Sequence, residues 1–339
     1  MDNQLYTQHN QVIKKLVFVS ILLALVVVTL GAYTRLTHAG LGCPDWPTCY
    51  GLIDVPRTAE QIAVAEQAYP QRPVEIGKAW NEMIHRYFAG ALGLLILTIA
   101  LLSVKNRAQG TPLRLPLLIL VIVIFQAALG MWTVTMKLMP IVVMAHLLGG
   151  FTTLCLLFLL YLRLKPHRIN CTDFSIKKYG RFGLLGIALL TGQIALGGWT
   201  SANYAALSCV ELPICQPGWQ QQMNFENSFD LIPPERESYE FGHLSHDERV
   251  TINVVHRFGA IVITIYLAWL LLMIYFKAQT STFKTSAVVV GVVLIIQLSL
   301  GVSNIWFSLP ISVAVGHNLV AACLMLSLIA LTYRLRRKI

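Results

Sequence analysis

The sequence predicts an all-α integral membrane protein: eight transmembrane helices as two tandem-repeat four-helix bundles, with both termini cytoplasmic. Three observations lead to this fold class. The 339 residues are 56% hydrophobic and only 12% charged, with a mean hydropathy of +0.64, whereas soluble domains carry about 25% charged residues. Charge-poor runs of about 20 residues, the length that crosses a bilayer, recur along the chain. The second half of the chain also repeats motifs of the first.

The repeat is clearest around the histidines. Segment 81–86 (NEMIHR) returns as segment 252–257 (INVVHR), an offset of 171 residues (256 − 85), and His146 maps onto His317 at the same offset. Each copy therefore carries two histidines. The symmetry is broken at Glu82, which becomes Asn253 in the second copy. We expect an N-terminal half of residues 1–170 and a C-terminal half of residues 171–339.

The first half is expected to hold four spans, at residues 16–34, 80–104, 115–134 and 141–162. No convincing small-x-small cleavage site follows the first span, so we interpret it as an uncleaved helix rather than a signal peptide. A long polar loop, 35–78, separates the first two spans and contains an expected short helix at Ala59–Ala68.

The second half repeats this plan after a basic linker at residues 163–181. Its spans are expected at residues 182–199, 250–276, 286–306 and 311–333, and its long polar loop at residues 201–249.

The charges predict the orientation. Most of the 26 Lys and Arg residues lie in the tails and short connections, whereas nearly all of the 16 acidic residues lie in the two long loops or at the adjoining span ends. The positive-inside rule then places both long loops on the outer side. The net charge of +10 is thus a signal of topology, and we exclude nucleic acid as a partner.

Two pairs of cysteines lie in the long loops. Cys43 and Cys49 form a CX5C motif that Cys209 and Cys215 repeat at an offset of 166 residues (209 − 43). An outer compartment is oxidising, so a disulfide is expected within each loop. It either stiffens the loop or, in the first pair, passes reducing equivalents by cycling between dithiol and disulfide.

The four span histidines are expected at one depth. His85, His146, His256 and His317 each follow the outer start of a span by five or six residues, which is about 8–9 Å at 1.5 Å per residue. Two imidazoles at one depth in a four-helix bundle suit axial ligation of a haem. The alternatives are interhelical hydrogen bonding and a zinc site, for which two histidines per half are too few.

Charged residues accompany these histidines. Arg86, Arg257 and Arg35 are candidates for binding haem propionates, with interfacial snorkelling as the alternative. Glu82 lies one helical turn before His85 and is the candidate catalytic acid or base. The alternative for Glu82 is an ion pair with Arg86 or with a basic loop residue.

These motifs together resemble the haem A synthase family, in its bacterial cysteine-bearing branch. The resemblance covers essentially the whole chain. Its motifs are segment 34–41 (TRLTHAGL), the ExxHR of Glu82 to Arg86, His146, His256 with Arg257, His317 and the paired loop cysteines.

The resemblance implies that the second half binds haem b through His256 and His317. The first half, with His85 and His146, then takes haem O as its substrate. The implied reaction oxidises the C8 methyl group of haem O to a formyl group by successive hydroxylations, giving haem A for a haem-copper terminal oxidase.

Two rival functions are weighed against this one. A di-haem b electron-transfer protein gives no reason for the change from Glu82 to Asn253, and a transporter would favour inverted repeats, whereas these are parallel. We expect a bacterial inner-membrane location with periplasmic long loops. The expected partners are haem O, membrane lipid, haem O synthase and a membrane electron donor, and a homo-oligomer remains open.

Overall fold

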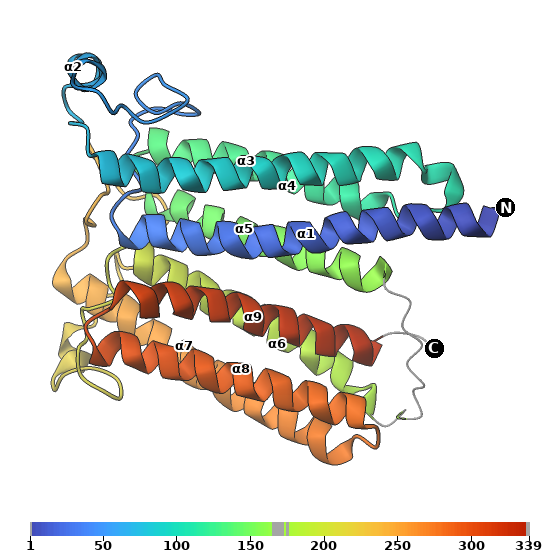
Figure 1. Cartoon of the computed structure of the whole chain (residues 1–339). Helices are drawn as coiled ribbons and strands as arrows, with labels where there is room; N and C mark the ends of the chain where they lie inside the picture. The colour runs from blue at the N-terminus through green and yellow to red at the C-terminus, as the bar shows by residue number, and fades with distance from the viewer. Residues whose placement is uncertain (1, 165–172, 174–175, 337–339) are drawn as a thin grey trace. The chain divides into compact units, whose positions relative to one another are not determined.

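The computed structural model describes residues 2–164, 173 and 176–336, and this part of the chain is helical apart from its loops and one isolated β-bridge. Eight of its helices are long and apolar enough to span a membrane, which confirms the predicted number of spans. The chain divides into two compact units, each described separately (Figure 1). The predicted boundary at residues 170/171 lies outside the described residues.

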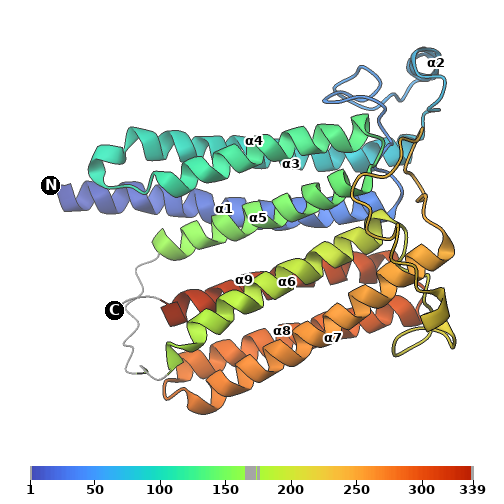
Figure 2. The same cartoon turned by 180° about the vertical axis from the view of Figure 1, so that it is seen from behind.

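Unit 1 contains a ring of four spanning helices. Helix α1 packs against α3 and α5, and α4 packs against the same two neighbours, so α3 and α5 face each other across the bundle. Figure 2 shows this bundle from behind. The helices of the unit are α1 (Asp2–Leu36), α2 (Ala59–Ala68), α3 (Ile76–Lys105), the 3-10 turn η1 (Arg107–Gln109), α4 (Arg114–Thr135) and α5 (Pro140–Leu164).

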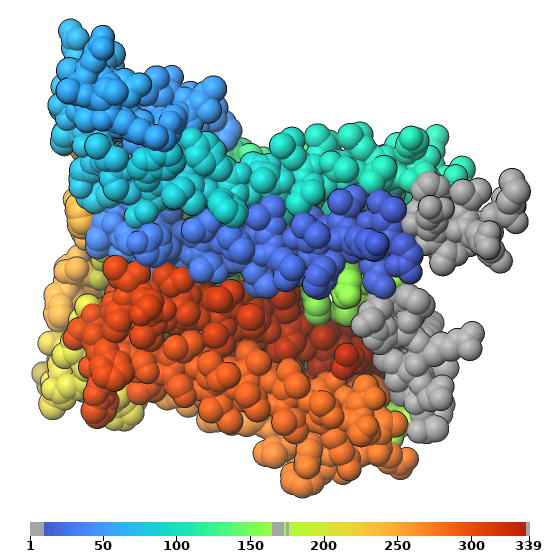
Figure 3. Space-filling view, in the orientation of Figure 1, coloured from blue at the N-terminus to red at the C-terminus, as the bar shows by residue number. Residues whose placement is uncertain are grey.

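Unit 2 repeats the ring in the same order. Helix α6 packs against α7 and α9, and α8 packs against the same two. Within each unit, the side chains of neighbouring helices touch along the face shown in the space-filling view (Figure 3). The helices of the unit are α6 (Tyr179–Ala202), the 3-10 turn η3 (Trp219–Gln222), α7 (His246–Lys277), α8 (Ser281–Trp306) and α9 (Ile311–Arg336).

Several helices extend beyond the predicted spans. Helix α1 begins at Asp2 rather than at residue 16, and α7 begins at His246 rather than at residue 250. Hydropathy finds the part of a helix inside the membrane, whereas local caps set its end. Ser245 accepts a hydrogen bond from the Glu248 amide, and Glu248 accepts one from the Ser245 amide, which forms a capping box. The short α2, which was expected around these residues, has an equivalent box at Thr58 and Gln61.

The two units also share their tight turns. Lys137 and Leu138, between α4 and α5, have φ values of 50° and 64°, and Ser308 and Leu309, between α8 and α9, have 55° and 63°. The Leu138 and Leu309 amides each donate back to the carbonyl five residues earlier, at 2.8 and 2.7 Å. These non-glycine residues adopt the left-handed conformation because the bond closes the turn.

One segment of the second long loop belongs to unit 1. Residues Pro234–Glu240 pack with unit 1. The Tyr239 amide donates to the Lys137 carbonyl at 3.0 Å, and Glu240 forms an ion pair with Arg72 at 2.8 Å. Tyr239 is only 6% exposed, so burial as well as polar contacts holds the segment.

Candidate functional site: paired histidines beneath two disulfide loops

Each span histidine faces a glycine of a neighbouring helix. A Cβ built on Gly31 of α1 would lie 3.0 Å from Cε1 of His85 on α3, and one on Gly130 of α4 would lie 3.4 Å from Cε1 of His146 on α5. Gly197 and Gly301 stand in the same relation to His256 and His317, each at 3.2 Å. The small residue thus gives the imidazole edge room against the neighbouring backbone. All four helices of each bundle meet at this level.

The two histidines of unit 1 lie close together. Their ring centroids are 6.4 Å apart and the rings are nearly perpendicular, at 85°. Two metal–imidazole bonds of about 2 Å each fit within such a separation. The Nδ1 atoms of both residues are buried. The main-chain carbonyls of Val27 and Gln126 lie within hydrogen-bonding reach of the His85 and His146 imidazoles, so an iron would take the other ring nitrogen of each histidine.

The histidines of unit 2 are held by amide side chains. The Gln193 amide nitrogen lies 3.0 Å from Nδ1 of His256, and that of Gln297 lies 3.4 Å from Nε2 of His317. Among the described residues, His, Cys, Asp and Glu side chains form no group of three or more that could hold a metal ion. Pairs of imidazoles are the donor set that a haem iron takes from a protein, so His85 and His146 fit a haem by their separation, and unit 2 has the equivalent pair of histidines.

Glu82 is buried at the loop end of unit 1 and is 5% exposed. One carboxylate oxygen accepts a hydrogen bond from the Cys43 amide at 2.9 Å, and the other pairs with Arg86 at 2.5 Å. Gly42 permits this approach, because a Cβ there would lie 2.6 Å from the Lys78 backbone. The contacts are thus those of the ion-pair alternative, with the loop amide added, while the catalytic role stays a prediction.

Asn253, the counterpart of Glu82, binds its own loop with the opposite polarity. Its side-chain amide donates to the carbonyls of Ala205 and Ala206, at 2.7 and 3.0 Å. Glu82 accepts from a loop amide where Asn253 donates to loop carbonyls. The change from Glu82 in unit 1 to Asn253 in unit 2 therefore keeps an anchor for the loop but leaves this position of unit 2 without a carboxylate.

The two arginines that follow a histidine hold the disulfide loops. Arg86 donates to the carbonyls of Asp45 and Thr48, at 3.0 and 2.7 Å. Arg257 donates to the carbonyls of Cys209, Glu211 and Ile214. No sequence pattern indicated these main-chain acceptors. Arg35 lies in the last turn of α1, and a propionate role for the three arginines stays a prediction.

Both cysteine pairs have the geometry of disulfides. The S–S distances are 2.01 Å for Cys43–Cys49 and 2.09 Å for Cys209–Cys215. In the first loop both cysteines are fully buried, whereas Cys215 in the second is partly exposed. The pair proposed for redox cycling is therefore the less accessible one, which disfavours direct thiol exchange in this conformation.

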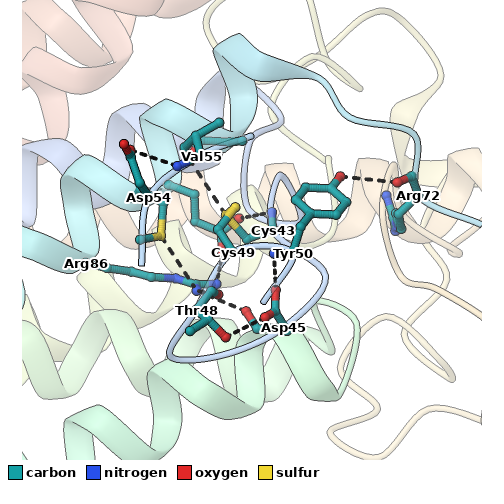
Figure 4. Close-up of a disulfide and its surroundings, with 12 residues drawn as sticks. Cys43, Asp45, Thr48, Cys49, Tyr50, Asp54, Val55, Arg72 and Arg86 are labelled. Carbon is teal, nitrogen blue, oxygen red and sulfur yellow. Dashed lines mark hydrogen bonds and ion pairs between the residues drawn. A yellow bond between two sulfur atoms is a disulfide. The ribbon is translucent and has the colours of Figure 1, made fainter. Parts of the chain in front are cut away.

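The first disulfide loop has a second stabilising centre, which the sequence analysis missed. Asp45 accepts hydrogen bonds from the amides of Tyr50 and Gly51, at 2.6 and 2.9 Å, and from the Thr48 hydroxyl. Figure 4 shows Asp45 inside this loop, beside Thr48 and Arg86. Asp45 follows Pro44 and lies two residues after Cys43. This pattern could have predicted the turn, because short acidic side chains commonly bind nearby amides.

Two titratable groups near the loop end of unit 1 have shifted pKa values. Burial, with smaller contributions from nearby carboxylates, raises the pKa of the Tyr50 phenol, whose hydroxyl contacts the carbonyls of Arg72 and Pro73. Burial, followed by the positive charges of Arg35 and Lys78, lowers the pKa of His38. Neutral forms are thus favoured for both groups.

Known proteins share this sequence pattern. Residues 14–329 match the model of the COX15-CtaA family, described as cytochrome oxidase assembly protein. A protein of Shewanella oneidensis named heme A synthase is 47% identical over 94% of this chain and 96% of its own length. Proteins of the same name from Neorickettsia sennetsu and Mesorhizobium japonicum are 28% and 26% identical, over 91% and 92% of this chain and 94% and 87% of their own lengths. The chain belongs to the COX15-CtaA family, in which these relatives are haem A synthases.

Proposed function

We propose that this protein is a haem A synthase, an oxidoreductase that converts the C8 methyl group of haem O to a formyl group by successive hydroxylations. One observation carries the proposal: the two units have equivalent pairs of histidines, but the buried Glu82 of unit 1 is replaced by Asn253 in unit 2. The relatives named heme A synthase, matched over nearly the whole chain, support the same reaction.

The two units take different roles in this proposal. His256 and His317 would hold a resident haem b in unit 2, where Gln193 and Gln297 lie against their rings. His85 and His146 receive the iron of the substrate, haem O. When bound, the resident haem supplies one-electron chemistry.

The chain itself contributes orientation and exclusion of water. His85 and His146, on opposite helices, would hold the substrate, and the glycines beside them leave room for the two imidazoles against α1 and α4. The disulfide loop, fastened by Glu82, Asp45 and Arg86, covers the loop end of α3. Arg86 and Arg257, which already hold loop carbonyls, and Arg35 in the last turn of α1 are our candidates for meeting propionates.

Glu82 is the proposed proton-handling residue. Its carboxylate is buried beside Arg86, within one helical turn of His85, so a proton can be held next to the substrate site without contact with bulk water. Releasing the Cys43 amide or Arg86 would free one of its oxygens. Opening of the loop and proton transfer are therefore coupled in this proposal.

The test is Glu82→Gln, with the haems extracted from the purified protein. The glutamine keeps the size and can still accept from the Cys43 amide, but it cannot exchange a proton. General acid–base catalysis contributes about 10²–10⁴-fold in rate, so we expect bound haem b and haem O with little haem A. Asp45→Asn is the control, because it weakens the same loop and leaves Glu82 intact. A normal yield of haem A from Glu82→Gln at equal expression would leave Glu82 with a structural role only.

The same extraction separates this function from di-haem b electron transfer, which the similar histidine pairs of the two units would also serve. A protein expressed where haem O is made should contain haem O or haem A if it is the synthase, and only haem b if it is an electron carrier. We further propose the bacterial inner membrane as its location, with the disulfide loops periplasmic. Haem O synthase and a membrane electron donor are the proposed partners.

A further inference from the structure

An open groove lies between helices α6 and α7 of unit 2, which run side by side (Figure 2). It has a volume of about 550 Å³. It is formed by the start of α6 and the second half of α7, at the end of the unit away from the disulfide loop. Its lining is apolar except for one phenol hydroxyl and one indole. The six lining residues are Phe182, Leu185, Val262, Ile265, Tyr266 and Trp269.

Aromatic rings in contact with one another form one wall of this groove. The Phe182 ring lies 5.3 Å from the Trp269 ring and is nearly perpendicular to it, at 82°. The Tyr266 and Trp269 rings are 5.8 Å apart, and the Tyr266 hydroxyl donates to the Phe182 carbonyl at 2.8 Å. These contacts join α6 to α7, so the groove has a defined wall rather than a loose lipid-facing surface.

Two lysine amines lie at the end of this row of rings. Tyr179 continues the row, with its ring 6.0 Å from that of Phe182, and the amines of Lys178 and Lys277 lie 5.6 and 5.9 Å from the centroid of the Tyr179 ring. Neither lysine forms an ion pair with a described residue. The carboxylate closest to Lys178 in the sequence, Asp173, already accepts bonds from the α7–α8 connection. Two positive charges therefore meet beside the groove and can bind one anion.

Unit 1 has neither the lysines nor the aromatic row at the corresponding positions. The repeat offset is 166 for α6 (209 − 43) and 171 for α7 (256 − 85), so Val12 corresponds to Lys178 and Asn106 to Lys277. Unit 1 nevertheless forms the same ring of four helices. Helix packing alone therefore does not require these side chains, and a ligand gives a reason for them. The positions of Phe182, Tyr266 and Trp269 are occupied in unit 1 by Leu16, Leu95 and Thr98.

The groove and the two amines together match the depth of one membrane leaflet. Val262 and Lys277 are 15 residues apart on α7, which is about 22 Å along a helix. Half a bilayer with its head groups is about 20–22 Å thick. An acyl chain in the groove would thus bring a phosphate to the level of the lysines. Basic pockets between spanning helices are a known way of binding anionic lipid head groups.

Two other occupants suit the groove less well. Oxidation of a quinol releases protons, and none of the six lining residues is a carboxylate or an imidazole that could accept them. The Tyr266 hydroxyl already donates to a carbonyl. A second copy of the chain, packed symmetrically through this groove, would bring the lysines of both copies toward one another.

We propose that the α6–α7 groove binds an anionic phospholipid, with one acyl chain in the groove and the phosphate at Lys178 and Lys277. This inference does not depend on the proposed function, because none of the groove residues belongs to the histidine sites. It assigns unit 2 a lipid contact that unit 1 lacks.

The test measures binding of phosphatidylglycerol and of phosphatidylcholine to the purified full chain by native mass spectrometry. We expect one phosphatidylglycerol to be retained in preference to phosphatidylcholine. Each lysine near a lipid phosphate contributes about fivefold in affinity, so Lys178→Gln with Lys277→Gln should weaken phosphatidylglycerol binding about 25-fold. The control is Lys15→Gln with Lys105→Gln, which removes two exposed positive charges from the corresponding end of unit 1 and should leave this binding unchanged.

A second variant tests the groove while keeping both lysines. Val262→Trp fills the groove and should displace the same lipid, whereas Val292→Trp adds equal bulk at an exposed position of α8 and should not. Melting in nanodiscs gives a readout that does not depend on the stability of each variant by itself. Replacing phosphatidylcholine by phosphatidylglycerol should raise the Tm of the unchanged protein more than that of either groove variant.

Three results would overturn the inference. The first is equal retention of the two lipids by the unchanged protein. The second is an equal loss of phosphatidylglycerol in the groove variants and their controls. The third is that Val262→Trp releases a bound quinone or separates two copies of the chain, while the lysine variant binds phosphatidylglycerol normally.

Discussion

At the scale of single residues, replacing any of the four span histidines is expected to cause a large loss of bound haem. Each stands against a glycine, so its ring has one allowed place, and in unit 2 each ring also contacts a glutamine. A haem held by two axial bonds loses one of them when either histidine is removed. The neighbouring glycine cannot supply a replacement donor.

We therefore expect His256→Ala and His317→Ala each to purify without the tightly bound haem b and to melt at a lower temperature. Binding of a ligand to the folded state alone stabilises it by about 4 kcal/mol at a thousandfold excess over Kd, and this contribution disappears with the haem. The absorption spectrum and a thermal melt check both effects. His243→Ala, in the second loop outside the span, is the control. A full haem b band in either axial variant would contradict the assignment.

Residue types and their spacing predicted much of the candidate site. The rest depends on contacts between segments that are distant in the sequence. The duplicated His-Arg motif and the two CX5C pairs were visible because a repeat offset compares the chain with itself. The loop carbonyls held by Arg86 and Arg257 were not visible, since every residue has a carbonyl and only the folded loops determine which ones the two arginines bind. Glu82 was found as a break in symmetry, but its partner Cys43 contributes an amide that no side-chain pattern reveals.

At the scale of elements, the two disulfide loops differ in what holds them. The first has Asp45, Glu82 and Arg86 in addition to its disulfide. The second has Arg257 and Asn253, but its Glu211, which occupies the position of Asp45, is exposed and accepts bonds only through its carbonyl among the described contacts. Its fold therefore depends more on the covalent link.

Replacing both cysteines by serine should accordingly destabilise the second loop more than the first. A disulfide that closes so short a loop is worth about 2–3 kcal/mol at most, and Asp45 offsets part of that loss in the first loop alone. Thermal melts of Cys43→Ser/Cys49→Ser and Cys209→Ser/Cys215→Ser compare the two directly. Activity per folded molecule should stay near normal for the second pair. Lost activity with an unchanged melt would indicate a redox role instead.

The connection between α7 and α8 is held by a carboxylate from the linker. Asp173 accepts hydrogen bonds from the amides of Gln279 and Thr280 and from the Thr280 hydroxyl. Thr280 is the N-cap of α8 and makes no side-chain cap bond of its own. Asp173 thus satisfies amides that would otherwise be open at that helix start.

This contact predicts a dependence on pH. Burial opposes ionisation of Asp173, but the bonds from Thr280 and Gln279 outweigh it and hold its pKa below the ordinary value. The group therefore contributes stability above its unfolded pKa of about 3.9, and the contribution is lost as the pH falls through the lower folded pKa. Asp173→Asn should lower the melting temperature near pH 6, by the equivalent of about 1 kcal/mol, and the difference should shrink below pH 4. The exposed Asp230→Asn serves as the comparison, and an equal pH response in both variants would contradict the prediction.

At the scale of the whole molecule, hydropathy was sufficient for the eight spans because each must be long and apolar to cross a bilayer. The duplication also predicted that the two bundles share one order of helices, which the packing shows in both units. The placement of Pro234–Glu240 in unit 1 could not be predicted from the sequence. Nothing in this Pro- and Glu-rich stretch is periodic, and its anchors, Arg72 and the Lys137 carbonyl, lie far away in the sequence.

The anchoring of this segment gives the last prediction. Tyr239 is buried and bonded through its amide and its hydroxyl, whereas the Arg72–Glu240 pair retains 34% and 11% side-chain exposure. Partly exposed ion pairs contribute at most about 1 kcal/mol, and burying an aromatic side chain contributes about 1.5–3 kcal/mol. Tyr239→Ala should therefore lower the melting temperature more than Glu240→Ala does. In a double-mutant cycle, Arg72→Ala with Glu240→Ala should show a measurable coupling, and the more exposed Arg57–Asp54 pair should show almost none. A larger loss from Glu240→Ala than from Tyr239→Ala would mean that charge, rather than burial, ties this segment of the second loop to unit 1.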